Sequence, residues 1–446
     1  MAKKPSRTME RKRLLDEAAS ITMPSECDVI VVGGGAAGLV AAITAAEAGA
    51  SVLVLERDLS CGRSILATGG GRCNFANIKL DPRRFNCPEF VDAVCGTRWL
   101  DDVLAFFRAS GMRWSLEDDR LYPMSRSAAS VRNVLLSRAR AAGVVLASAR
   151  EVVGYEYIDT LPPWPTEEAL KMRDKDPYYG MSVEVSVVEA FSEKGLFLLP
   201  NAQALVLATG GGPVPPVSDL KMGWAPLSPA LCPIACADSP LSVLDGRRVH
   251  ATATLTKAGS FFPSWRERGE VLFRSYGLSG IVTFDLSRRA EAGDLVELDL
   301  VPDLSNSELR QLVDPFASGS FSDGCLDGVI DPEIARVLEG LARERWHIEW
   351  PERAVPKSDS EALMSLAKAL PFLVTGLAEI DRAQVMRGGL SVEQFDPETL
   401  ASREHPWLFA CGEALDVDAD CGGYNLGWAW KSGMVAGAAA ARWAKR

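Results

Sequence analysis

The residues best suited to chemistry lie near the start of the chain, in a glycine-rich turn and a carboxylate that follows it. Residues 33–38 carry the pattern G-x-G-x-x-G directly after a short apolar run. In such a turn Gly33 permits the tight bend, Gly35 lets backbone approach a pyrophosphate, and Gly38 lets a helix pack closely on the strand. Glu56 follows about 20 residues later, where a carboxylate accepts hydrogen bonds from a ribose. The pattern predicts a dinucleotide site that accepts a free 2′-hydroxyl and disfavours a 2′-phosphate.

A strand, a helix and a second strand must position this turn. Residues 29–32 are apolar and β-branched, residues 36–48 are rich in alanine, and residues 51–55 are apolar again. A strand–turn–helix of this kind points the free N–H groups of the helix start at an anion. Residues 29–46 carry no charge and are long enough to resemble a membrane span. The glycine triplet, Glu47 and the second strand argue against a span.

A second polar, glycine-rich loop follows at residues 68–77, TGGGRCNFAN. Three glycines with an arginine, a cysteine and two asparagines suit a loop that wraps a planar or phosphorylated ligand. A plain surface loop is the alternative, but it accounts for neither the glycine triplet nor the closely spaced amides.

Two later apolar strands also run into glycine, at residues 204–211 and 408–413. The carboxyl ends of strands in an open α/β sheet border one crevice. We therefore expect one extended cofactor to touch four segments, namely residues 33–38, 68–77, 209–212 and 412–425.

The composition indicates a protein of two or three domains in a reducing compartment. The chain has 446 residues with 48 basic and 59 acidic side chains, so its net charge of −11 offers no general attraction to nucleic acid. Its ten cysteines include no C-x-x-C pair, and its three histidines lie far apart in the sequence. No metal site is predicted, and the absence of a secretory h-region favours a cytoplasmic protein that does not enter a membrane.

The remaining chain divides into helices, a β-meander and an inserted module. A basic, partly helical tail occupies residues 1–27, and residues 159–179 are expected to be a loop extension of the meander. Alternating apolar residues predict strands at 249–256, 270–273, 281–286 and 295–300. Apolar spacing predicts helices at 99–110, 130–142, 307–313, 332–343, 360–370 and 425–441.

These motifs together resemble the two-dinucleotide-fold flavoproteins, and most closely the family that includes aminoacetone oxidases and bile-acid reductases. The resemblance is carried by residues 68–77, DRLYPMS (119–125), GEVLFRSYGLSG (269–280) and FACGEALDVDADCGGYNLGWAWKSG (409–433). It implies an α/β fold, in which a Rossmann-like FAD-binding domain is split by an insert with a β-barrel-like part and a helical part. The implied boundaries are 28–211 and 377–446 for the FAD-binding domain, 212–302 for the β-rich part and 303–376 for the helical part.

The resemblance also implies which residues contact FAD, with Val152 meeting adenine through its backbone and the segment after Gly422 meeting the flavin ring. The implied contacts are Gly33, Gly35, Ala36, Ala37, Gly38, Glu56, Arg57, Gly62, Thr68, Gly69, Gly70, Gly71, Arg72, Cys73, Asn74, Asn77, Val152, Ala208, Thr209, Gly210, Gly412, Glu413, Asp416, Gly422, Gly423, Tyr424, Asn425 and Leu426. A helix beginning near Asn425 would aim its positive end at the flavin N1 and C2 oxygen.

Two segments depart from the family pattern. Relatives carry a serine, a proline and G-S-T-G-D-G-Y after the third glycine segment, whereas residues 212–224 are shorter and lack it. Relatives also carry T-x-G-G-V where residues 386–390 read MRGGL. These departures leave the FAD prediction in place and the substrate pocket undefined.

The predicted activity is hydride transfer between FAD and a small organic substrate, such as a steroid-like enone or an amino ketone. NAD(P)H or oxygen would serve the other half-reaction, and no second glycine fingerprint indicates a nicotinamide domain. Candidate proton-handling groups are Tyr276, Cys73 and Tyr424, although the two tyrosines could simply pack and Cys73, which lacks a C-x4-C partner, could be an inert thiol. The alternatives are a non-catalytic flavin-binding protein and a flavoprotein of the tRNA-modifying kind.

Overall fold

The computed structural model describes residues 6–191, 197–212, 222–314, 322–347 and 356–446. The chain divides into two compact units, Met1–Ser228 with Val385–Arg446, and Pro229–Gln384. The inserted domain expected from the sequence spans residues 212–376. Strand β11 (Trp224–Ala230), which enters the second unit at Pro229, pairs with β18 (Val385–Leu390).

The first unit is built on a mixed sheet whose central strands are parallel. The parallel strands are β6 (Val145–Ser148), β2 (Val52–Glu56), β1 (Glu26–Val32), β10 (Asn201–Leu207) and β19 (Leu408–Ala410), in that order. The antiparallel strands β8 (Met181–Glu189), β7 (Arg150–Asp159) and β9 (Phe197–Leu198) extend it. Parallel strands end at one edge of the sheet, so the loops after β1, β2, β10 and β19 all meet there.

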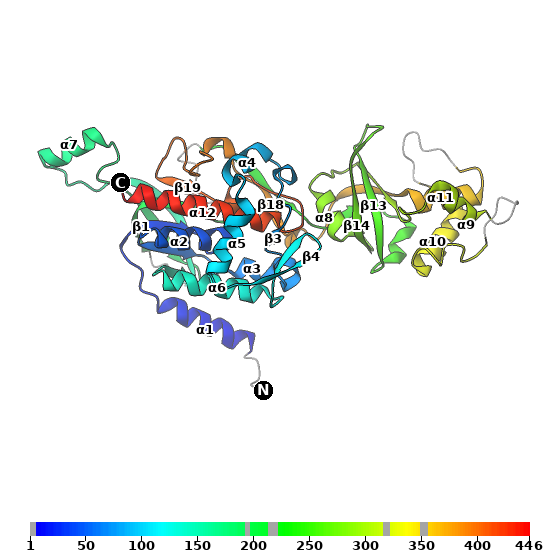
Figure 1. Cartoon of the computed structure of the whole chain (residues 1–446), viewed down its shortest axis with the longest axis horizontal. Coiled ribbons are helices and arrows are strands. Elements are labelled where there is room, and N and C mark those ends of the chain that lie inside the picture. Colours follow the sequence, from blue (N-terminus) through cyan, green and yellow to red (C-terminus); the bar gives the residue numbers. More distant parts are fainter. Residues whose placement is uncertain (1–5, 192–196, 213–221, 315–321, 348–355) are drawn as a thin grey trace. The chain divides into compact units, whose positions relative to one another are not determined.

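Two helices, α2 (Ala36–Glu47) and α12 (Tyr424–Ala444), lie side by side in the first unit (Figure 1). Their backbones approach closely because glycine occupies the contact. A Cβ atom at Gly433 would lie 2.5 Å from the Ala37 carbonyl oxygen, and one at Gly437 would lie 2.2 Å from the Ala41 carbonyl oxygen. No larger side chain fits at either position without moving a helix.

Shorter elements complete the first unit. The helices at 99–110 and 130–142 expected from the sequence are confirmed as α5 and α6, each within two residues of the predicted ends. The remaining elements are α1 (Arg7–Ala19), α3 (Arg63–Ala67), α4 (Pro88–Cys95), α5 (Trp99–Ala109), α6 (Ala128–Ala141), β3 (Ala76–Asn77), β4 (Trp114–Glu117) and β5 (Arg120–Pro123).

The segment at 159–179, expected to be a loop, contains helix α7 (Glu167–Lys175). Its N-cap Thr166 accepts a hydrogen bond from the Ala169 amide, a cap that stabilises even a short helix. An ion pair between Arg173 and Asp159, at 2.7 Å, ties the helix to the end of β7. The prediction was wrong because prolines and charges before the cap hid the helix start.

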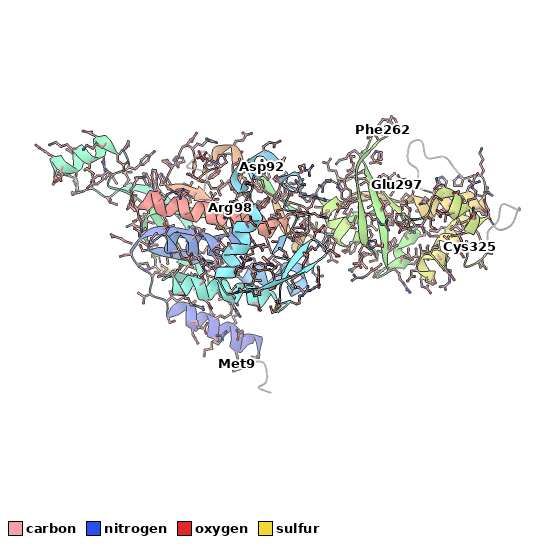
Figure 2. The ribbon with its side chains drawn as sticks, viewed as in Figure 1. Met9, Asp92, Arg98, Phe262, Glu297 and Cys325 are labelled. Atoms are coloured by element: carbon pink, nitrogen blue, oxygen red, sulfur yellow. The ribbon has the colours of Figure 1, made fainter. Side chains whose placement is uncertain are left out.

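The second unit contains a closed barrel and a group of helices, as the resemblance implies. The barrel order is β12 (Ile234–Cys236), β15 (Gly277–Ser279), β14 (Pro263–Arg274), β13 (Arg248–Thr256), β16 (Leu295–Asp299) and β17 (Leu370–Leu377). Its helices are α8 (Ile281–Ser287), α9 (Asn306–Val313), α10 (Pro332–Arg343) and α11 (Asp359–Lys368). Phe262 lies in the hairpin turn between β13 and β14 with 79% of its surface exposed (Figure 2).

One predicted strand of the insert is a helix. Residues 281–286 were expected to be extended because Ile, Val, Thr and Phe favour strands. The structure forms α8 there, and Val282 and Leu286, four residues apart, are both buried. Burial of this helical face overrides the local preference.

Candidate functional site

The glycine turn between β1 and α2 is shaped by contacts within the protein at two of its three fingerprint positions. Gly33 has φ of 104°, and a Cβ atom there would lie 2.3 Å from the Ala208 carbonyl oxygen. A Cβ atom at Gly38 would lie 1.9 Å from the Gly33 carbonyl oxygen. Gly35 differs, because its nearest neighbour would be Ser64 Oγ at 3.4 Å. The space in front of Gly35 is therefore open to a ligand.

The first turn of α2 presents unpaired N–H groups beside that space. Gly35 is the N-cap and provides no side-chain cap, and the first hydrogen bond within the helix runs from the Leu39 amide to the Gly35 carbonyl. The amides of Ala36, Ala37 and Gly38 thus have no acceptor within the helix, an arrangement that favours an anion. Ser64 faces the same turn, and its type and spacing did not predict a contact because a single serine carries no distinctive pattern.

Glu56 ends β2 and holds the glycine turn in place. Its two carboxylate oxygens accept hydrogen bonds from the Gly34 and Asp58 amides, each at 2.7 Å. Burial raises the pKa of Glu56, and the two amide donors oppose that shift. Each carboxylate oxygen keeps a further lone pair, so a ribose contact stays a prediction. Arg57 beside it is exposed.

The loop at 68–77 leaves several groups open. Gly69 and Gly70 are left-handed, with φ of 55° and 62°, and nothing lies within 4 Å of a Cβ atom placed at Gly70 or Gly71. Asn74 Oδ1 is buried without a hydrogen-bond partner. Arg72 is occupied, because its guanidinium pairs with Glu117 at 2.6 Å.

The segment before α12 lies directly against this loop. Asn77 Nδ2 donates to the Gly422 carbonyl at 3.0 Å, although the two residues are 345 positions apart. A Cβ atom at Gly423, whose φ is 95°, would lie 2.9 Å from Asn74 Oδ1. Asn425 bonds through its side chain to the amide and carbonyl of Ala419, so it shapes the turn that precedes the helix.

The last two segments join the same edge of the sheet. A Cβ atom at Gly412 would lie 2.7 Å from Ala37 Cβ, and one at Gly210 would lie 3.9 Å from a carboxylate oxygen of Glu413. Thr209 Oγ1, like Asn74 Oδ1, is buried without a partner. All four glycine segments therefore meet, and they leave free amides, open glycines and two unsatisfied polar atoms. A buried polar group of this kind is costly unless a ligand or water satisfies it, so the residues fit a dinucleotide with a polar ring.

The other predicted contacts are placed as follows. Gly62 is left-handed with φ of 73°, and its amide donates to the Gly34 carbonyl at 2.7 Å. Val152 pairs with Val187 beside a β-bulge. Thr68 donates its hydroxyl to the Ile65 carbonyl at 2.7 Å, and Leu426 lies half-buried in the first turn of α12.

The three candidate proton-handling groups have different surroundings. Burial raises the pKa of Cys73 to about 11, which makes it a neutral thiol at neutral pH. Burial also raises the pKa of Tyr424, whose ring lies 6.0 Å from the Arg84 guanidinium carbon. Tyr276 belongs to the second unit, where its hydroxyl donates to Glu379 at 2.9 Å and burial raises its pKa to about 12.

Thr209→Val tests the unsatisfied hydroxyl. Valine removes a buried polar atom that has no partner in the protein, so the thermal midpoint of the ligand-free variant should equal or exceed that of the wild type. If the hydroxyl bonds FAD, the dissociation constant should rise up to about tenfold, measured by fluorescence titration. Thr283→Val is the control, because that buried hydroxyl donates to the Ser279 carbonyl at 2.8 Å. The control should lose stability and keep its FAD affinity, and equal FAD affinity in both variants would remove Thr209 from the site.

The described residues contain neither a candidate metal site nor a candidate membrane-spanning helix. No group of three or more His, Cys, Asp or Glu side chains could hold a metal ion there. Within the same ranges no helix combines the length and apolarity that crossing a membrane requires. The ten cysteines are free thiols.

Comparison with known proteins gives matches along most of the chain. A family model described as HI0933-like protein Rossmann domain matches residues 27–161 and 184–439. The unmatched interval between these ranges contains α7.

Two curated relatives and one solved structure illustrate the similarity. A 3-dehydro-bile acid delta(4,6)-reductase of Clostridium scindens is 29% identical, over 92% of this chain and 98% of that protein. A ribosomal RNA dihydrouridine synthase of Escherichia coli is 24% identical, over 91% of this chain and 96% of that protein. The open conformation of a flavocytochrome c3 fumarate reductase aligns with a TM-score of 0.47 and 14% identity, over 99% of this chain and 82% of that chain.

Proposed function

The chain belongs to the HI0933-like family of Rossmann flavoproteins, whose members compared above include FAD-dependent oxidoreductases, and from that premise we propose that it reduces a carbon–carbon double bond conjugated to a carbonyl. The hydride would come from bound FAD, and NAD(P)H would reload the cofactor. The observation that carries the proposal is the meeting of four glycine segments around unsatisfied polar groups, in a family of this chemistry.

The names of two relatives support the type of reaction. One is a delta(4,6)-reductase of 3-dehydro-bile acids, and the other forms dihydrouridine in ribosomal RNA. Both names describe the saturation of a double bond next to a carbonyl. The bile-acid relative covers more of this chain at higher identity, so a steroid-like enone is the first substrate to test.

The protein's own residues have three tasks in this proposal. The free amides of Ala36 and Ala37 would hold the pyrophosphate, and Glu56 would receive a ribose hydroxyl. Thr209 and Asn74 would satisfy their unpaired atoms on the cofactor. The start of α12, at Tyr424, would stabilise negative charge on the near edge of the ring. Bound FAD supplies the hydride chemistry, and the protein supplies orientation and charge.

An RNA substrate is the second candidate, because a relative acting on ribosomal RNA covers 91% of this chain. The net charge of −11 argues against general attraction to nucleic acid, but it does not decide against a local contact. The cytoplasmic location expected from the cysteine pattern and the lack of a secretory h-region stays a prediction.

The deciding experiment is an anaerobic titration of the purified yellow protein with NADH and with NADPH. We expect one of them to bleach the flavin. A 3-oxo steroid with a conjugated double bond should then restore the colour in stoichiometric amount, whereas a saturated 3-oxo steroid should not. Recolouring only by uridine-containing ribosomal RNA would support the second candidate, and recolouring only by oxygen would indicate an oxidase. A flavin that no donor reduces would contradict an enzymatic role.

A further inference from the structure

One carboxylate holds both of the segments that connect the two units. Glu413 Oε1 accepts a hydrogen bond from the Met386 amide at 2.5 Å, and the Gly211 amide donates to the same carboxylate. Gly211 follows β10 on the segment that leaves the first unit, and Met386 lies in β18 on the segment that returns to it. The outgoing and returning segments are therefore fastened at a single side chain.

Two further acids fasten the returning strand. Asp416 Oδ1 accepts from the Gly388 amide at 3.1 Å. Asp418 is fully buried, and its carboxylate receives the Arg387 guanidinium at 3.1 Å. Three acidic side chains within six residues thus bind three successive residues of β18, and none of these contacts involves a ligand.

The position of Glu413 is itself determined by helix α12. The preceding residue, Gly412, donates its amide to Ser432 Oγ at 2.9 Å and accepts from Trp428 Nε1 at 3.0 Å. Gly412 also lies against Ala37 at the start of α2. Through Gly412, the Glu413 carboxylate therefore connects the outgoing and returning segments to α2 and α12. The first turns of these two helices border the candidate FAD site.

We propose that Glu413 is a positioning residue, whose ionised carboxylate holds the outgoing and returning segments against the edge of the sheet that binds FAD. It would act on FAD through Gly210 and Gly211 rather than by contact with the cofactor. The inference depends on the proposed function only in taking this edge as the FAD site.

The two amide donors favour the ionised form of Glu413. A carboxylate offers full acceptor capacity at both oxygens, whereas a protonated acid turns one of them into a donor. Burial raises the pKa of Glu413 to about 7, and the negative charge of Asp418 acts in the same direction. Arg57, which follows β2, places a cation near the outgoing segment: its Nη2 lies 4.0 Å from a Cβ atom placed at Gly212.

The pH dependence has a definite sign. If FAD requires the ionised carboxylate, FAD affinity rises with pH up to about 7 and is constant above it. The stability of the ligand-free protein changes in the opposite direction. The pKa of Glu413 in the folded protein lies above its usual value, so the protonated side chain contributes to stability at low pH. That contribution is lost as the pH rises through about 7.

Hydrogen exchange of the full-length protein without FAD tests the contact itself. In Glu413→Gln the neutral amide oxygen is a weaker acceptor than the carboxylate, and the side-chain NH2 group can only donate. The Gly211 or Met386 amide should therefore exchange at least about tenfold faster than in the wild type, while residues 29–32 of β1 are unchanged. Glu398→Gln, at an exposed turn position, is the matched control. Unchanged exchange at both amides would overturn the proposal.

FAD titration at several pH values tests the consequence. Wild-type affinity should fall up to about tenfold per pH unit below pH 7, and Glu413→Gln should be weaker at neutral pH and nearly independent of pH. An identical pH profile in the two proteins would overturn the proposal. If the Gln variant does not fold, Glu413→Asp, which keeps a titrating carboxyl but shortens its reach, should bind FAD more weakly than the wild type at every pH, and equal affinity would overturn the proposal. Failure of the wild type to bind FAD would contradict the proposed function, while the exchange result would still decide the contact.

Discussion

Gly35→Val will give a folded, colourless protein, whereas Gly38→Ala will not fold stably. A Cβ atom at Gly35 meets nothing closer than Ser64 Oγ at 3.4 Å, and the backbone there, with φ of −78°, suits any residue. A Cβ atom at Gly38 would lie 1.9 Å from a backbone oxygen that cannot move without displacing the turn. The two glycines of one motif thus serve different purposes, one for the ligand and one for the fold.

The magnitudes follow from that difference. Valine at Gly35 places its methyl groups in the space expected for the pyrophosphate, so FAD affinity should fall at least about 100-fold while the midpoint of thermal unfolding barely changes. Alanine at Gly38 should cost about 3 kcal/mol or more, as overpacking against backbone does. Circular dichroism and the flavin absorbance of the purified proteins measure both effects.

Gly328→Val provides the control for these variants, because nothing lies within 4 Å of a Cβ atom at that position in the second unit. It should keep both the fold and FAD. Stoichiometric FAD in Gly35→Val would remove the glycine turn from the cofactor site. A stable Gly38→Ala protein would show that the Gly33 carbonyl can move to accommodate the added Cβ atom.

Gly437→Ala will destabilise the first unit by about 3 kcal/mol, at the upper end of the cost of one inserted methyl group. The added Cβ atom would lie 2.2 Å from the Ala41 carbonyl oxygen, so α12 and α2 would have to separate. Separation would also disturb the site, because the first turns of both helices border it. Urea unfolding followed by tryptophan fluorescence measures the loss, and retention of FAD is the second readout.

The matched control is Gly340→Ala in α10, where nothing lies within 4 Å of the new atom. There the same substitution should stabilise the protein by about 0.5–1 kcal/mol, because alanine is the better helix former. If Gly437→Ala were as stable as the wild type, the close approach of the two helices would be unnecessary for the fold.

Local sequence patterns were sufficient for the α/β class, the glycine turn and most helices of the first unit. A strand, three glycines and an alanine-rich run define that unit through backbone sterics and side-chain periodicity, which act over a few residues. The same local reasoning failed at α8, where strand-forming residues adopt a helix, and at α7, where prolines hid the cap. Burial outweighed the local preference at α8, whereas α7, which has no buried residues, rests on its own cap at Thr166.

The partners of the polar side chains were decided by the tertiary structure alone. Glu413 and Asp416 read as cofactor ligands in the sequence, yet their carboxylates accept from amides of β18, which arrives only after the chain has passed through the second unit. Asn77 reaches Gly422 across 345 positions, and Gly437 touches Ala41 on another helix. Residue type and spacing specify which groups need a partner, whereas the path of the chain determines which partner lies within hydrogen-bond distance.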